Sequence, residues 1–241
     1  MRNILLIIVF TFLCFTQFSY CQEDKQNSEI NSTVPELFAY HDVIYPMWHT
    51  AYPNKDYKML KELLPKVTEG AEKIYQAKLP GILRDKENEW KKGIEKFQLS
   101  VKNYEEACNK DENDMMLASA EKLHSDYEML VRIIRPVTKE VDEFHKVLYM
   151  IYHHYWPDGD MIEFKEAVDD LDELAAELNN CVLPKWAADK SGAFTEQSQK
   201  LYESTQSLKA LKDSDADNVE IDKAIENVHS NYVALEGLFD E

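Results

Sequence analysis

Glycine, proline and basic residues are all scarce in this chain of 241 residues. Six glycines and eight prolines are too few for the many turns of an all-β protein or for a glycine-rich phosphate loop. Acidic residues outnumber basic ones by 45 to 27, giving a net charge of −18, whereas nucleic-acid binding needs a basic surface. The motifs GxGxxG, GxxxxGK[ST], CxxC and GxSxG are absent. The composition therefore argues against a nucleic-acid partner and predicts an acidic, all-α protein.

The amino terminus has the features of a secretory signal peptide. Arg2 precedes a twelve-residue run, 4–15, that is apolar apart from Thr11, and Ser19 and Cys21 are small residues at a cleavage site. The run is shorter than the roughly 20 residues of a membrane-spanning helix. We expect a signal peptide over 1–21, a flexible polar leader over 22–35, export to the periplasm or the medium, and no integral membrane segment after cleavage. A lipid anchor on Cys21 is the second choice, because Tyr20 fits a lipoprotein signal poorly.

Two cysteines, Cys108 and Cys181, remain in the mature chain. In an oxidising compartment they could form a disulfide, but two cysteines do not make a framework pattern. A disulfide and a pair of free thiols both stay open from the sequence.

The chain matches itself at an offset of 104 residues. Between 41 and 80, twelve of forty positions are identical to the residue 104 positions later, and after a one-residue insertion 121–127 matches 226–232. This period is too long for a solenoid repeat, which runs for roughly 20–50 residues. We expect a tandem duplication, with helical repeats over 36–135 and 136–241.

Each repeat has the pattern of four helices. In the first repeat, apolar residues recur at spacings of three and four over 60–74, 90–108 and 116–134. In the second repeat the same pattern covers 162–178 and 221–239. Short connections favour antiparallel neighbours, so we predict an up-down four-helix bundle in each repeat.

Six of the seven histidines occupy equivalent positions in the two repeats. In each repeat, a glutamate also lies three residues before the last of these histidines. Imidazole and carboxylate groups are ligands for zinc, copper, iron or nickel, and a Glu-x-x-His pair on a bundle helix can place both ligands inward. The candidate metal ligands are His41, His49, Glu121, His124, His145, His153, Glu226 and His229. His41 and His49 lie about 12 Å apart along a helix, so they cannot bind one ion together, but His124 could reach either. We expect His41, Tyr45, His124 and Tyr127 to face the interior of the first repeat, and their counterparts that of the second.

The leading hypothesis is an exported, non-enzymatic binding protein with a histidine-centred site in each repeat. A transition metal ion is the first choice of ligand and haem b the second. The alternative is a structural or protein-interaction module whose repeated His and Tyr residues form buried hydrogen-bond networks. Catalysis ranks third, because no nucleophile–base pair or pair of acids stands out.

Overall fold

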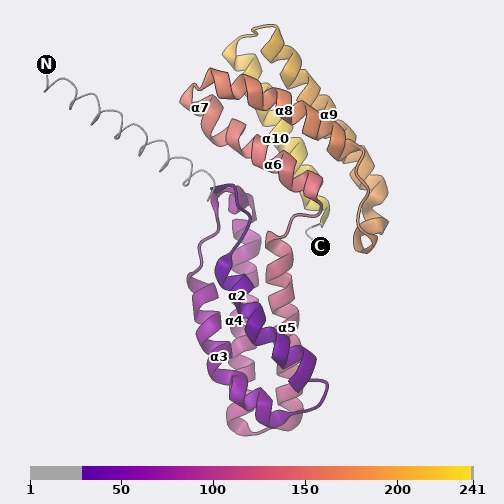
Figure 1. The fold of residues 1–241 in the computed structure, drawn as a ribbon. Helices are drawn as coiled ribbons and strands as arrows, with labels where there is room; N and C mark the ends of the chain where they lie inside the picture. Colours follow the sequence, from indigo (N-terminus) through magenta and orange to yellow (C-terminus); the bar gives the residue numbers. More distant parts are fainter. Residues whose placement is uncertain (1–28, 240–241) are drawn as a thin grey trace, which may run out of the picture. The chain divides into compact units, whose positions relative to one another are not determined.

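The computed structural model describes residues 29–239, and the predicted signal peptide lies outside this range. The described residues form helices joined by short connections, without a strand, so the prediction of an all-α protein is confirmed. They divide into two compact units, and the boundary along the chain lies between Arg135 and Pro136. Each unit is described by itself below (Figure 1).

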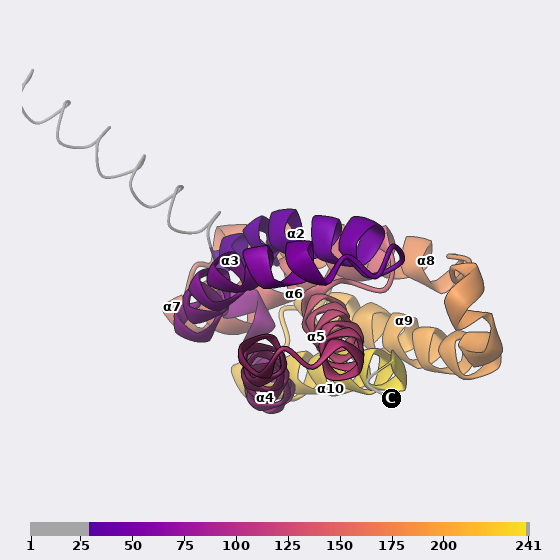
Figure 2. The same cartoon turned by 90° about the horizontal axis from the view of Figure 1, so that it is seen from below.

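The part of unit 1 from Pro35 onward contains four α-helices. Its elements are α2 (Pro35–Pro46), a π-helix (Met47–Ala51), α3 (Tyr57–Gln76), a 3-10 helix (Gly81–Lys86), α4 (Glu87–Lys110) and α5 (Asn113–Ile134). Helix α3 packs against α2 and α4, and α4 lies along α5, as Figure 2 also shows. Both α2 and the π-helix contact α5 as well, so α5 packs against both ends of this set of helices in the sequence, α2 and α4.

Unit 2 has the same order of long helices. Its elements are α6 (Lys139–Met150), a π-helix (Ile151–Tyr155), the short α7 (Trp156–Asp158), α8 (Met161–Asn179), a 3-10 helix (Lys185–Lys190), α9 (Ser191–Asp213), α10 (Asn218–Glu236) and a 3-10 turn (Gly237–Phe239). Helix α8 packs between α6 and α9, α9 packs along α10, and the π-helix contacts α10. Each of the first five shared elements begins 104 residues after its counterpart in unit 1, and α10 begins 105 residues after α5.

Local sequence signals fix several helix ends. Pro35 opens α2, where its missing N–H is not needed. Asp56 caps α3 by accepting a hydrogen bond of 2.9 Å from the Met59 N–H, as expected for an acidic residue after a proline turn. Helix α4 ends at Asp111, whose φ of 58° is left-handed, and the Asp111 carboxylate pairs with Lys61 on α3. The same pairing recurs in unit 2 between Lys165 and Asp215, at 3.1 Å.

Both cores are apolar and contain large aromatic residues. The core of unit 1 includes Leu37, Tyr40, Ile44, Leu60, Val67, Phe97, Tyr104, Leu123, Tyr127 and Leu130, and that of unit 2 includes Phe144, Leu148, Phe164, Leu171, Phe194, Leu201, Ile225 and Tyr232. In unit 1 the buried hydroxyls of Tyr40, Tyr104 and Tyr127 each donate to a backbone carbonyl. This satisfies the polar end of each ring without help from a histidine.

The two cysteines within residues 29–239 are free thiols. Cys108 is buried in unit 1 and Cys181 is half-buried in unit 2. Burial raises the pKa of both thiols above the ordinary value, which keeps them protonated and poorly reactive.

Candidate functional site

A five-residue π-helix follows the first helix of each unit and carries one of the repeated histidines, His49 or His153. Its wide turn is closed by i→i+5 hydrogen bonds, such as the 2.9 Å bond that the Tyr52 N–H donates to the Met47 carbonyl. π-Helical segments are rare in proteins overall, and those that occur often lie at functional sites. The two π-helices begin at Met47 and Ile151, so they occupy equivalent positions.

A proline shortly after each π-helix gives a physical reason for the wide turn. Pro53 and Pro157 lie four residues after His49 and His153. In a regular α-helix a proline ring clashes with the carbonyl four residues earlier, and it cannot donate to that carbonyl. Widening the helix moves this carbonyl away from the ring. The histidine therefore lies where the backbone departs from α-helical geometry.

In unit 1, three aromatic rings form a continuous stack between the π-helix and α5. The indole of Trp48 lies on the imidazole of His124, with ring centroids 4.1 Å apart and planes inclined by 8°. The ring of Tyr52 stacks on the indole of Trp48, with ring centroids 4.5 Å apart. The Tyr52 hydroxyl donates to Glu121 Oε2 at 3.1 Å. Glu121 is therefore held by a tyrosine.

Unit 2 repeats this arrangement with the two aromatic residues exchanged, because Tyr152 and Trp156 stand where unit 1 has Trp48 and Tyr52. Tyr152, which lies 104 residues after Trp48, stacks on His229 with centroids 4.3 Å apart. Its hydroxyl donates to Glu226 Oε1 at 2.6 Å. A single tyrosine thus performs the stacking of Trp48 and the hydrogen bonding of Tyr52.

A second row of rings follows α2 on its outer face. The Tyr45 ring lies 5.7 Å from that of His41 and 4.6 Å from that of His49. Both histidines are exposed, and Tyr45 is 54% exposed. The expectation that His41 and Tyr45 face the interior is therefore wrong. The reason is that Leu37, Tyr40 and Ile44 supply the buried face of α2 and turn the histidine stripe outward.

The expectation for the other two residues of unit 1 holds in part. Tyr127 is buried, and its hydroxyl donates to the Leu37 carbonyl at 3.2 Å. The His124 side chain is 20% exposed at the edge of the core. In unit 2, His145 and Tyr149 are buried, and the His145 ring stacks on Tyr232 at 4.3 Å.

Burial and neighbouring charged groups both act on the pKa of His124. Partial burial is the largest cause that lowers the pKa of His124, and the nearby imidazoles of His49 and His41 lower it further. Glu128, whose Oε1 lies 3.9 Å from His124 Nε2, acts in the opposite direction. A lowered pKa leaves the imidazole neutral, and therefore able to bind a metal ion, at a more acidic pH than usual.

The predicted ligands do not form a complete coordination sphere. Among the described residues, no three His, Cys, Asp or Glu side chains converge as metal ligands. Glu121 and Glu226 are engaged by tyrosine hydroxyls. In unit 1 the imidazole of His49 is near enough to lower the pKa of His124, and in unit 2 the rings of His153 and His229 both contact Tyr152.

The aromatic partners of the histidines were missed from the sequence. Trp48 and Tyr152 are both aromatic and lie one residue before His49 and His153, which is the signal that could have revealed them. Trp156 also contacts α10, because its indole N–H donates a hydrogen bond to Asp222.

Comparison with known proteins gives no family for the chain. No family model, no curated protein and no solved structure matches it. Within the described part of the chain, no helix has the length and apolar character needed to cross a membrane.

Proposed function

We propose that this chain is an exported, non-enzymatic binding protein made of two related four-helix units, each with a histidine-centred site. The order of the elements and their constant offset of 104 or 105 residues support a duplication. The expected domains are 36–135 and 136–241, preceded by the signal peptide and the polar leader.

The observation that carries the proposal is the recurrence of one unusual local structure. A π-helix presents a histidine beside a stacked aromatic–imidazole pair, Trp48 with His124 and Tyr152 with His229. A π-helix has poorer geometry than an α-helix, and half-exposed rings contribute little to a core. Their presence at both equivalent positions is better explained by a shared binding role than by stability.

A transition metal ion remains the first choice of ligand, with zinc, copper, iron or nickel in agreement with imidazole coordination. His49 and His124 are the ligand pair that we propose for unit 1, and His153 and His229 the pair for unit 2. Water or a second molecule would complete the coordination sphere. Haem b, with one of these imidazoles as its axial ligand, is the second choice.

The test is calorimetric titration of the full mature chain with Zn²⁺ and Cu²⁺, together with thermal unfolding. Ions that bind the folded chain stabilise it by about 2.7 kcal/mol at a hundredfold excess over the dissociation constant, which raises the melting temperature. Binding should weaken below about pH 6, since ligating imidazoles must be neutral. The double variant H124A/H229A should lose both the heat of binding and the shift, whereas the control H154T, which introduces the Thr50 of unit 1, should keep them.

The second candidate is a structural module, and the His145–Tyr232 stack favours it. This imidazole is 8% exposed and lies against a core tyrosine. If neither metal nor haem binds, and H145A lowers the stability while H124A does not, the metal proposal is overturned and the histidines of unit 2 are packing residues.

A further inference from the structure

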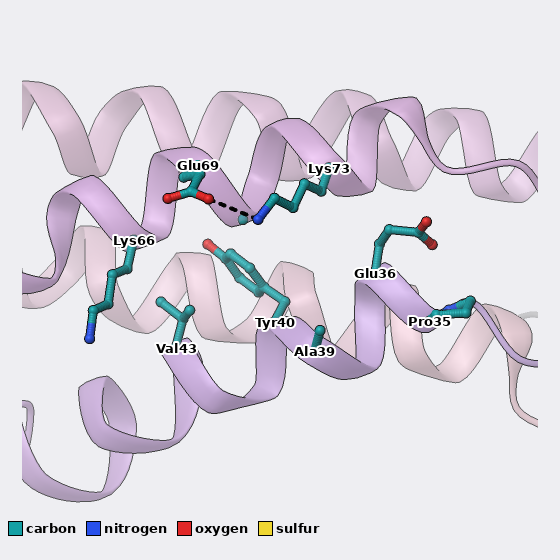
Figure 3. A pocket seen from close by; sticks show the side chains of 9 residues that line it. Pro35, Glu36, Ala39, Tyr40, Val43, Lys66, Glu69 and Lys73 are labelled. Atoms are coloured by element: carbon teal, nitrogen blue, oxygen red, sulfur yellow. Dashed lines mark hydrogen bonds and ion pairs between the residues drawn. The ribbon is translucent and has the colours of Figure 1, made fainter.

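An apolar groove of about 370 Å³ lies between α2 and α3 of unit 1, and no histidine lines it. Figure 3 shows Tyr40 at its centre, Val43 and Lys66 at one end, and Pro35 and Glu36 at the other. Its volume is within the range of roughly 300–1,000 Å³ that is typical of small-molecule sites, which are mostly apolar with a few polar groups.

Two small residues, Ala39 and Gly70, line the groove. Gly70 lies in the middle of α3, where glycine destabilises a helix by about 1 kcal/mol relative to alanine. A Cβ atom at this position would be 2.5 Å from Tyr40 Cδ2, so the glycine lets the tyrosine ring lie against the helix. Ala39 forms part of the facing wall on α2. In unit 2 the positions 104 residues later hold Glu143 and Leu174, which are both larger.

Two of the four charged side chains that line the groove pair with each other, and the other two lie at its opposite ends. Lys73 is paired with Glu69 at 2.8 Å beside Tyr40, so these two charges offset each other. Among the described residues, Glu36 and Lys66 have no ion pair, and they lie at opposite ends of the groove (Figure 3). The positions equivalent to Lys66 and Lys73 are Asp170 and Glu177 in unit 2, so a lysine in this place is particular to unit 1.

We infer that this groove binds a short peptide with both termini free and an apolar middle. Its amino group pairs with Glu36, its carboxylate pairs with Lys66, and its side chains lie on Tyr40, Val43 and Pro35. Glu36 and Val43 are seven residues apart in α2, about 10 Å along the axis. An extended chain covers about 3.3–3.6 Å per residue, so a tripeptide spans that length. A protein terminus offers only one of the two charges, and a fatty acid lacks the amino group.

The test uses the full mature chain, labelled with ¹⁵N, and the tripeptide Ala-Leu-Ala with free ends. Titration should shift the backbone amides of Gly70, Val43 and their neighbours in a saturable way. The variant A39E introduces the residue of unit 2 at an exposed position of the wall and should abolish these shifts. The control A118E makes the same change at an exposed position of α5, outside the groove, and should leave binding unchanged.

Capped peptides test the two charges separately. Acetylation of the amino end and amidation of the carboxyl end should each weaken binding about two- to fivefold, the range expected for exposed ion pairs. In K66A the amidated and free peptides should bind equally well, and in E36Q the acetylated and free peptides should do so. Absence of saturable shifts at the groove would overturn the inference. Binding that A39E leaves unchanged, or that neither cap weakens, would also overturn it. All of these results are independent of metal binding.

Discussion

At the scale of single residues, two of the glycines that lie in long helices, Gly70 and Gly192, have different roles. Gly70 is required by a close approach, since a side chain there would meet the Tyr40 ring at 2.5 Å. Gly192, at the start of α9, faces open space, with no atom within 4 Å of an added Cβ. The same substitution therefore probes packing at one site and helix propensity at the other.

We predict that Gly70→Ala lowers the free energy of unfolding. The gain in helix propensity is about 1 kcal/mol. Overpacking against a buried tyrosine costs about 1–3 kcal/mol, so the net effect should be a loss. Gly192→Ala should be neutral or slightly stabilising. Urea unfolding followed by circular dichroism measures both changes, and a Gly70→Ala chain as stable as the parent would contradict the close approach.

The pKa of His124 gives a prediction about pH. The unfolded chain takes up a proton at this imidazole near pH 6.5, whereas the folded chain does so only at a lower pH, mainly because of burial. Between these two values the unfolded state binds more protons, so the free energy of unfolding falls as the pH falls. His124→Asn should reduce this loss when unfolding is compared at pH 7.5 and 5.5.

Glu128 supplies a matched variant for the same measurement. Its carboxylate raises the pKa of His124 against the other influences, so Glu128→Gln should make the acid sensitivity greater. An acid dependence that is the same in the parent, His124→Asn and Glu128→Gln would show that His124 does not have the lowered pKa.

At the scale of elements, each π-helix places one repeated histidine, His49 or His153, where the backbone departs from α-helical geometry. Five residues after α2 turn through a wider helix before Pro53 ends it. A proline at position 46 is not the common cause, because unit 2 has Met150 there and forms a π-helix all the same. The shared Pro53 and Pro157 fit the recurrence better, through the clash that a proline makes with the carbonyl four residues earlier.

Removing one residue should convert the π-helix to an α-helix. We predict that deletion of the exposed Thr50 leaves the helix content nearly unchanged, because the turn closes with i→i−4 hydrogen bonds instead. The deletion rotates Trp48 relative to the residues that follow, so its stack on His124 should be lost. The indole ¹H–¹⁵N resonance of Trp48 should move in this variant but not in Thr50→Ala. An unmoved resonance in the deletion variant would show that the π-turn does not set the stack.

At the scale of the whole molecule, the acidic surplus is unevenly divided. Positions 1–135 contain 18 basic and 21 acidic residues, whereas positions 136–241 contain 9 and 24. The net charges of −3 and −15 that follow mean that self-repulsion acts mainly within unit 2. Salt screens such repulsion, with a Debye length of about 10 Å at 0.1 M.

We predict that residues 36–135 and 136–241, expressed separately, each fold as a helical domain. Each unit has its own apolar core, and the boundary falls at Arg135 and Pro136. Circular dichroism and thermal unfolding should give a cooperative transition for both pieces. Raising the salt from about 0.02 M to about 0.5 M, roughly 25-fold, should stabilise the second piece more than the first. A piece that is unfolded alone would contradict the division into two units.

The sequence by itself determined the helical class and much of the helix layout. Apolar residues at spacings of three and four identify α3, α4, α5, α8 and α10, because tertiary packing needs one apolar face on each helix. The cap at Asp56 follows from a local rule and needs no knowledge of the fold. The offset of 104 residues was also visible in the sequence, and the elements follow it.

Only the tertiary structure decided how the histidines are arranged. Helix α2 is apolar or aromatic around most of its surface, so the periodicity of its sequence does not tell which side is buried. Packing of α2 on α3 and α5 placed Leu37 and Tyr40 inside and His41 outside. The expected separation of about 12 Å between His41 and His49 assumed a regular α-helix up to His49, whereas the π-helix begins at Met47. The stack of Trp48 on His124 joins residues that are 76 positions apart in the chain, a contact that helical periodicity cannot specify.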